Sequence, residues 1–126
     1  MLALVAKGLA AVRVQLPLAL SDDSEPEPDL AVVPPGSYRD GHPRRALLVI
    51  EVADSPLRKD RREKGALYAE AGVPEYWIVD TTGERVEVHS EIVDGVYGRV
   101  MPHGRGSVIA ALALPELRVA VDEIFG

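Results

Sequence analysis

The pattern of hydrophobic and polar residues predicts several short strands and one main helix. Residues 2–10 are largely apolar and predict the end of a short helix. Val12, Val14 and Leu16 then alternate with polar residues, the period of two that is typical of a half-buried strand. An acidic, proline-containing stretch, SDDSEPEPD, predicts a loop, and residues 29–33 predict a second strand.

The most apolar strand is expected over residues 46–53, whose sequence ALLVIEVA is typical of a strand covered on both faces. A helix is expected after it. Asp60 and Glu63 have the spacing of a capping box, and Gly72 lies two residues before Pro74, so we place the helix between Asp60 and Gly72.

The second half of the chain predicts mainly strands. A short strand is expected over residues 76–79, an antiparallel pair over 86–89 and 97–101 with a turn at Asp94-Gly95, and a last strand over 108–111. The closing segment LPELRVAVDEIF suits either a short helix or an edge strand. The order of elements indicates a single α/β (α+β) domain, residues 1–126, with a mixed sheet.

Composition and charge restrict the partners of this domain. The net charge of −6 repels a polyanion, so binding to nucleic acid would depend on a local basic cluster. Residues 44–64 hold seven of the 14 basic residues and only four acidic ones. The chain has no cysteine, which excludes disulfides and thiolate metal sites and suits a cytoplasmic protein. Arg13 and Gln15 interrupt the apolar N-terminus, so no membrane span is expected.

Glu51 is a charged residue within the most apolar strand, and its carboxylate needs a partner there. If the sheet places Asp29 beside it, the two carboxylates would suit Mg²⁺, which prefers one or two carboxylates together with water and phosphate oxygens. Two structural alternatives remain open. Asp29 is also typical of a turn residue at the start of a strand, and Glu51 could be a buried acid paired with an arginine.

Lys64 shares a helix face with apolar residues. Leu67, Tyr68 and Ala71 follow it at i+3, i+4 and i+7, so the lysine is expected to point toward the sheet. Such a lysine can simply extend its ammonium group to the rim of the core. Beside two carboxylates it could instead neutralise them, hold an attacking water and stabilise negative charge on a phosphorus atom.

The segments PEPDLAVV, LLVIEVADSP and LYAEAGVPEYWIVD resemble the Uma2 family, also called DUF820, of the PD-(D/E)xK nuclease superfamily. The resemblance runs over about residues 12–97, and YAEAGVPEYWIVD is its most specific part. It implies a restriction-endonuclease-like mixed β-sheet core flanked by helices. It also implies Mg²⁺-dependent or Mn²⁺-dependent hydrolysis of phosphodiester bonds in DNA.

The resemblance also assigns site residues. Asp29 looks like the aspartate of the superfamily's P-D element and Glu51 like its acidic strand residue. The superfamily lysine normally follows two positions later, where this chain has Ala53, but in this family it lies on the next helix, which matches Lys64. The implied metal ligands are Asp29, Glu51 and the backbone carbonyl of Val52, with Lys64 orienting water or offsetting charge.

The resemblance implies DNA as the partner, bound through its backbone by a basic group at the start of the helix, namely Arg58, Lys59, Arg61 and Arg62. These residues equally suit a solvated helix face. Family members carry a further N-terminal region with another glutamate near the site, and we expect this chain to lack it. Two alternative functions therefore remain: a catalytically inactive scaffold or binding module that forms a homodimer, and another metal phosphohydrolase such as a ribonuclease.

Other features favour ordinary structural roles. His42, His89 and His103 lack the spacing of metal ligands and are expected at the surface. Tyr76 and Trp77 are expected in the core between the helix and the sheet. The loop HGRGS lacks the lysine and the spacing of a phosphate-binding loop.

Overall fold

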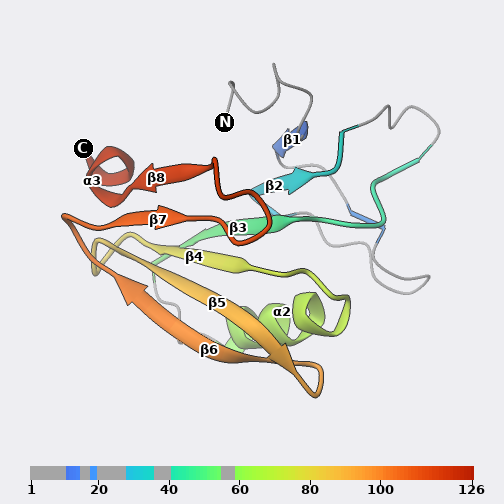
Figure 1. Ribbon diagram of the computed structural model, residues 1–126. Helices are drawn as coiled ribbons and strands as arrows, with labels where there is room; N and C mark the ends of the chain where they lie inside the picture. The colour runs from blue at the N-terminus through green and yellow to red at the C-terminus, as the bar shows by residue number, and fades with distance from the viewer. Residues whose placement is uncertain (1–10, 15–17, 20–27, 36–40, 55–58) are drawn as a thin grey trace.

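A computed structural model describes residues 11–14, 18–19, 28–35, 41–54 and 59–126 (Figure 1). The helix expected over residues 2–10 lies outside the described residues. The described elements are β1 (Ala11–Val14), β2 (Leu30–Val33), β3 (Leu48–Ala53), α2 (Lys59–Glu70), β4 (Tyr76–Asp80), β5 (Arg85–Val93), β6 (Val96–His103), β7 (Val108–Ala110), β8 (Arg118–Ala120) and α3 (Val121–Phe125).

The first six strands form one mixed sheet in the order β1-β2-β3-β4-β5-β6. β3 and β4 are parallel, and the other neighbours in this sheet are antiparallel. A parallel pair requires a crossover connection, and α2 lies within it. This arrangement confirms the predicted α+β class with a mixed sheet. No helix in the described part of the chain is long and apolar enough to cross a membrane.

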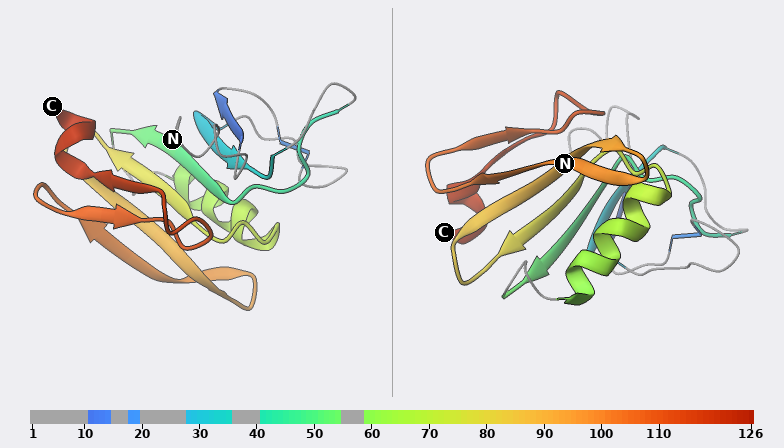
Figure 2. Two further views of the ribbon diagram at one scale, coloured as in Figure 1. Left: turned by 45° about the horizontal axis from the view of Figure 1, so that its top comes forward. Right: turned by 90° about the horizontal axis from the view of Figure 1, so that it is seen from below.

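The main sheet is covered on both faces (Figure 2). On one face, α2 packs against side chains from the central strands, among them Val49 and Ile78. On the other face, β7 supplies Ile109, the segment before β8 supplies Leu117 and α3 supplies Val121 to a second apolar cluster. The two central strands are therefore largely buried from both sides, as the apolar sequence of residues 46–53 predicts, with the exposed Val52 as the exception.

Tyr76 and Trp77 separate into these two clusters. Successive residues of a strand point to opposite faces, so Tyr76 faces α2 whereas Trp77 packs with Leu117 and Val121. The prediction that both rings lie between the helix and the sheet is correct for Tyr76. It is wrong for Trp77, because the second sheet was not expected to cover the opposite face.

The predicted helix and hairpin are confirmed, with shifted ends. α2 starts one residue before Asp60 and ends two residues before Gly72, whose φ of +79° suits the left-handed conformation after a helix. β5 and β6 are longer than expected. Asp94 and Gly95 lie between these two strands and both have positive φ, as a tight two-residue hairpin turn requires.

The closing segment forms both a strand and a short helix, the two alternatives that its sequence left open. β8 pairs with β7 in a separate two-stranded sheet, and α3 follows directly. The N–H of Val121 donates to the carbonyl of Ser107, which joins the start of α3 to the turn before β7. The strand over residues 108–111 is thus confirmed, but it belongs to this second sheet.

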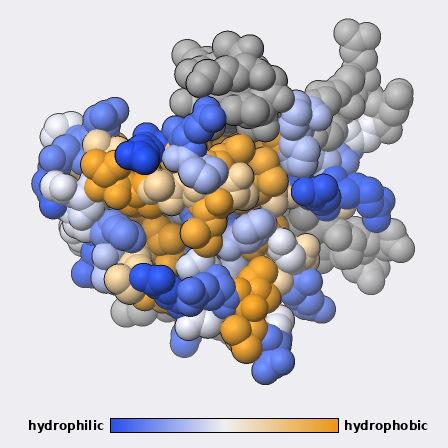
Figure 3. Space-filling model, in the orientation of Figure 1, coloured by the Kyte–Doolittle hydropathy of each residue, from blue (hydrophilic) through white to orange (hydrophobic). Residues whose placement is uncertain are grey.

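β6 forms one edge of the main sheet and is mostly exposed. Apolar side chains reach the surface near the β5–β6 turn, where Val93 and Val96 are about half exposed (Figure 3). The burial of the main sheet is therefore concentrated around β3 and β4, the strands that position the candidate site.

Glu75 is a buried acid that connects the two sheets. Its carboxylate accepts hydrogen bonds from the indole N–H of Trp77 at 2.6 Å and from the backbone N–H of Leu112 at 3.0 Å. Burial raises the pKa of Glu75, and the bond from Trp77 opposes this rise only in part. Glu75 therefore holds the segment after β7 against the main sheet.

Replacing Glu75 by glutamine is expected to change how stability depends on pH. Because burial raises the pKa of Glu75 above its usual value of 4.5, the folded chain holds this proton more tightly than the unfolded chain. The resulting stabilisation is complete below pH 4.5 and is lost as the pH rises through the raised pKa. Urea unfolding across this pH range should show the wild-type stability falling relative to Glu75→Gln. A difference that stays constant or rises with pH would contradict this assignment.

Candidate active site

The pairing of β2 with β3 brings Asp29 to the level of Glu51. Leu30 pairs with Ile50 in an antiparallel register, so the residue before Leu30 lies opposite the residue after Ile50. The Oδ2 atom of Asp29 accepts a hydrogen bond of 2.8 Å from the backbone N–H of Val52. Asp29 therefore lies at the carboxyl end of β3, beside Glu51, so the condition for two neighbouring carboxylates is met.

Glu51 is 1% exposed, and Lys64 and Tyr76 both donate to its carboxylate. Its Oε1 atom accepts a hydrogen bond of 2.8 Å from Nζ of Lys64, and its Oε2 atom accepts one of 2.9 Å from the hydroxyl of Tyr76. An ionised carboxylate in such a place requires compensation, and an ammonium group with a hydroxyl donor supplies it.

Lys64 reaches this carboxylate from the middle of α2. The side chain of Lys64 is 39% exposed, whereas that of Glu51 is 2% exposed, so the pair spans the boundary between the core and solvent. Tyr68, one turn later, is fully buried. The inward face predicted from the spacing of Lys64 and Tyr68 is confirmed, and Lys64 lies at its rim.

The backbone at Val52 adds an oxygen on the side of Asp29. In a strand, the N–H and C=O groups of one residue point to the same neighbour. The N–H of Val52 points to Asp29, so its carbonyl faces the same side, whereas the next carbonyl, of Ala53, accepts from Thr81 on the β4 side. The carboxylates of Asp29 and Glu51 thus share one end of β3 with a carbonyl group.

These oxygens suit the metal that the family resemblance implies. Mg²⁺ prefers hard oxygen ligands and usually binds one or two carboxylates while keeping water and substrate oxygens. Within the described ranges, no group of three or more histidine, cysteine, aspartate or glutamate side chains could hold a metal ion. The fit therefore rests on two carboxylates and a carbonyl, with one oxygen of Glu51 bound to the partly exposed ammonium group of Lys64.

An aromatic cluster packs beside the site. The ring of Tyr76 lies 5.0 Å from that of Tyr68, 5.5 Å from that of His89 and 6.4 Å from that of Tyr97, measured between centroids. The Nε2 atom of His89 is 2.6 Å from Oε1 of Glu87. The expectation that His89 lies at the surface is wrong, because its side chain is only 18% exposed within this cluster.

Among the described residues, the ring contacts of the aromatic cluster involve neither of the other two histidines. His42 is exposed, as expected, and His103 is half-buried. Of the predicted DNA-binding residues, Arg62 is exposed on α2. Arg58 and the side chains of Lys59 and Arg61 lie outside the described part of the structure.

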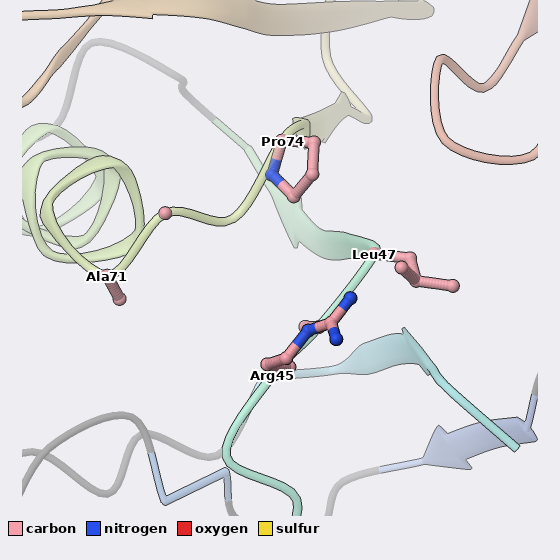
Figure 4. A pocket seen from close by; sticks show the side chains of 6 residues that line it. Arg45, Leu47, Ala71 and Pro74 are labelled. Carbon is pink, nitrogen blue, oxygen red and sulfur yellow. The ribbon is translucent and has the colours of Figure 1, made fainter.

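A pocket of about 70 Å³ lies away from the carboxylates, between the end of α2 and the start of β3 (Figure 4). Its lining residues are Arg45, Ala46, Leu47, Ala71, Gly72 and Pro74. None of them is a predicted catalytic residue. The candidate site lies instead at the opposite, carboxyl end of β3.

Tyr76 is the site residue that sequence reasoning missed. Its place in an apolar run, YWIVD, indicates only a core residue. Two considerations together would have identified Tyr76. A buried carboxylate such as that of Glu51 needs more than one donor, and the parallel pairing of β3 with β4 sets Tyr76 opposite Val49, on the same face of the sheet as Glu51. That register follows from the fold and not from the local sequence.

Comparison with known proteins identifies the family and supports the fold. The model of the Uma2 family, described as "Putative restriction endonuclease", matches residues 2–122. The crystal structure of a "putative nuclease belonging to DUF820 from Anabaena variabilis ATCC 29413" has a TM-score of 0.72 and 14% sequence identity, covering 97% of this chain and 71% of that chain. This similarity confirms the fold that the resemblance implies. No curated protein matches the chain. Since the family model spans nearly all of its residues, the chain belongs to the Uma2 family.

Proposed function

We propose that this protein is a metal-dependent endonuclease that hydrolyses phosphodiester bonds of DNA. The observation that carries the proposal is that Asp29 is bound to the backbone of Val52, next to Glu51, whose buried carboxylate lies 2.8 Å from Nζ of Lys64. Family membership supports the same reaction class.

Asp29, Glu51 and the carbonyl of Val52 would hold Mg²⁺ or Mn²⁺. Such an ion, when bound, lowers the pKa of a water molecule and polarises a phosphate. Lys64 lies at the rim of the site, so its ammonium group can face a substrate as well as Glu51. In the proposed reaction, Lys64 orients the attacking water or offsets negative charge that builds up on the phosphate.

Supercoiled plasmid provides the test of this function. Wild-type protein is expected to nick the plasmid with Mg²⁺ or Mn²⁺ and not with EDTA. Asp29→Asn should slow nicking by about 10²-fold or more, because it removes a charged ligand worth several kcal/mol. Asp94→Asn is the matched control, since asparagine tolerates the positive φ at this hairpin turn.

Two outcomes would contradict the proposal. Cleavage that persists in EDTA, or that Asp29→Asn leaves unchanged, would separate the activity from this site. An RNA of similar length, tested in parallel, distinguishes a ribonuclease from the proposed DNA endonuclease. Absence of cleavage on both substrates would favour the inactive scaffold.

Arg62, together with Arg58, Lys59 and Arg61, is proposed to contact the DNA backbone. Replacing Arg62 by alanine should weaken binding to duplexes of any sequence, because a phosphate contact carries no base information. It should also reduce the slope of log affinity against log salt concentration by about 0.9, the value for one lost phosphate contact. Fluorescence anisotropy in EDTA measures both quantities without cleavage.

Arg118→Ala is the control for this measurement, since Arg118 is an exposed arginine on β8, on the other side of the main sheet. It should leave the salt dependence unchanged. Equal slopes for Arg62→Ala and wild-type protein would remove Arg62 from the DNA interface.

A further inference from the structure

Tyr76 and Lys64 donate to different oxygens of Glu51. The side chain of Tyr76 is fully buried, and its hydroxyl donates to Oε2 of Glu51 at 2.9 Å. We infer that Tyr76 is a positioning residue that fixes the Glu51 carboxylate for metal binding, an inference that rests on the proposed function. It acts through Glu51 and need not touch the metal or the DNA.

The surroundings of Tyr76 explain how its hydroxyl keeps one direction. Its ring packs against those of Tyr68 and His89, with centroids 5.0 and 5.5 Å away. Glu87 in turn lies 2.6 Å from Nε2 of His89 and restrains that ring. Because close-packed rings cannot swing without displacing their neighbours, the hydroxyl of Tyr76 remains aimed at Glu51.

Lys64 and Tyr76, which both donate to Glu51, differ in their freedom to move. Lys64 is partly exposed and has a long flexible side chain, so it can release Oε1. Tyr76 has no such freedom. We therefore expect a cation to bind Oε1 in exchange for Lys64, while Oε2 stays bound to Tyr76. Hydrogen-bond partners of metal ligands commonly change metal affinity by about 10-fold to 100-fold when they are removed.

Tyr76→Phe removes the hydroxyl and keeps the ring, and Tyr97→Phe is its matched control. The hydroxyl of Tyr97 donates to the carbonyl of Val73 at 2.7 Å, so both variants lose one hydrogen bond from the same aromatic cluster. Titration with Mn²⁺, followed by the EPR signal of the free ion, should show affinity about 10-fold weaker for Tyr76→Phe. Tyr97→Phe should match wild-type protein. In plasmid cleavage at saturating Mn²⁺, Tyr76→Phe should lower kcat and leave KM for DNA unchanged.

Three further results decide the inference. Equal Mn²⁺ affinity of the two phenylalanine variants would overturn it, while the proposed function would stand if Glu51→Gln still abolished binding. If the wild-type protein binds no Mn²⁺, or if Glu51→Gln does not weaken its Mn²⁺ binding, both the inference and the proposed function would be overturned. A crystal structure of the wild-type protein with Mn²⁺ does not depend on how a variant folds. It should keep Tyr76 on Oε2 of Glu51, and loss of that contact would overturn the role of Tyr76 alone.

Discussion

Glu51→Gln is expected to reduce metal-dependent DNA cleavage by about 10³-fold or more. The substitution keeps the size of the side chain but removes the negative charge that would bind the cation. A metal ion in such a site supplies several kcal/mol of stabilisation to the developing charge, and each 1.4 kcal/mol corresponds to a factor of ten in rate. Initial rates of plasmid nicking with Mg²⁺ measure the effect.

Glu75→Gln is the control for this variant. Glu75 is also a buried glutamate, 2% exposed, but it lies against the second sheet. Its substitution tests whether the loss of any buried carboxylate impairs the protein. Cleavage should therefore survive in Glu75→Gln. Comparable cleavage by Glu51→Gln and the wild-type protein would place the reaction elsewhere.

Lys64→Met is expected to lower both activity and stability. Loss of the ammonium group should slow cleavage by about 10²-fold, the usual effect of removing one group that stabilises charge in a transition state. It also removes the ammonium group that lies 2.8 Å from the buried carboxylate of Glu51. Removing one partner of a fully buried pair costs about 3–5 kcal/mol. Since Lys64 is partly exposed, we expect a smaller loss of about 2 kcal/mol in the free energy of unfolding.

A double substitution separates the charge effect from lost packing. In Glu51→Gln/Lys64→Met the carboxylate is absent, so the penalty for an unpaired buried charge disappears. Urea unfolding should show the double variant to be more stable than Lys64→Met alone. Additive destabilisation by the two substitutions would instead mean that the pair is energetically independent, against the contact of 2.8 Å between them.

Much of the fold follows from local sequence patterns. The apolar run around Glu51 predicts a strand buried on both faces, and the helical spacing of Lys64 predicts its inward face. Both features depend on residues close in sequence, so they can be read without knowing the fold. The neighbourhood of Asp29 and Glu51 required a further assumption, that their strands are adjacent, and the register of β2 and β3 confirms it.

The remaining features depend on contacts between distant segments. Trp77 faces the second sheet because β7, β8 and α3 pack there, and nothing near Trp77 in the sequence indicates this. His89 is enclosed because β5 carries it next to the rings of Tyr76 and Tyr97. The hydrogen bond from Tyr76 to Glu51 joins residues 25 positions apart. Local patterns carry no information about such distant pairs.

The location of bound Mn²⁺ tests the central claim most directly. Anomalous diffraction from crystals of the wild-type protein soaked in Mn²⁺ identifies the ion without any assumption about activity. We predict a peak about 2.2 Å from carboxylate oxygens of both Asp29 and Glu51, with Nζ of Lys64 moved away from Oε1. An ion bound only elsewhere, with Glu51 still held by Lys64, would contradict the proposed metal site.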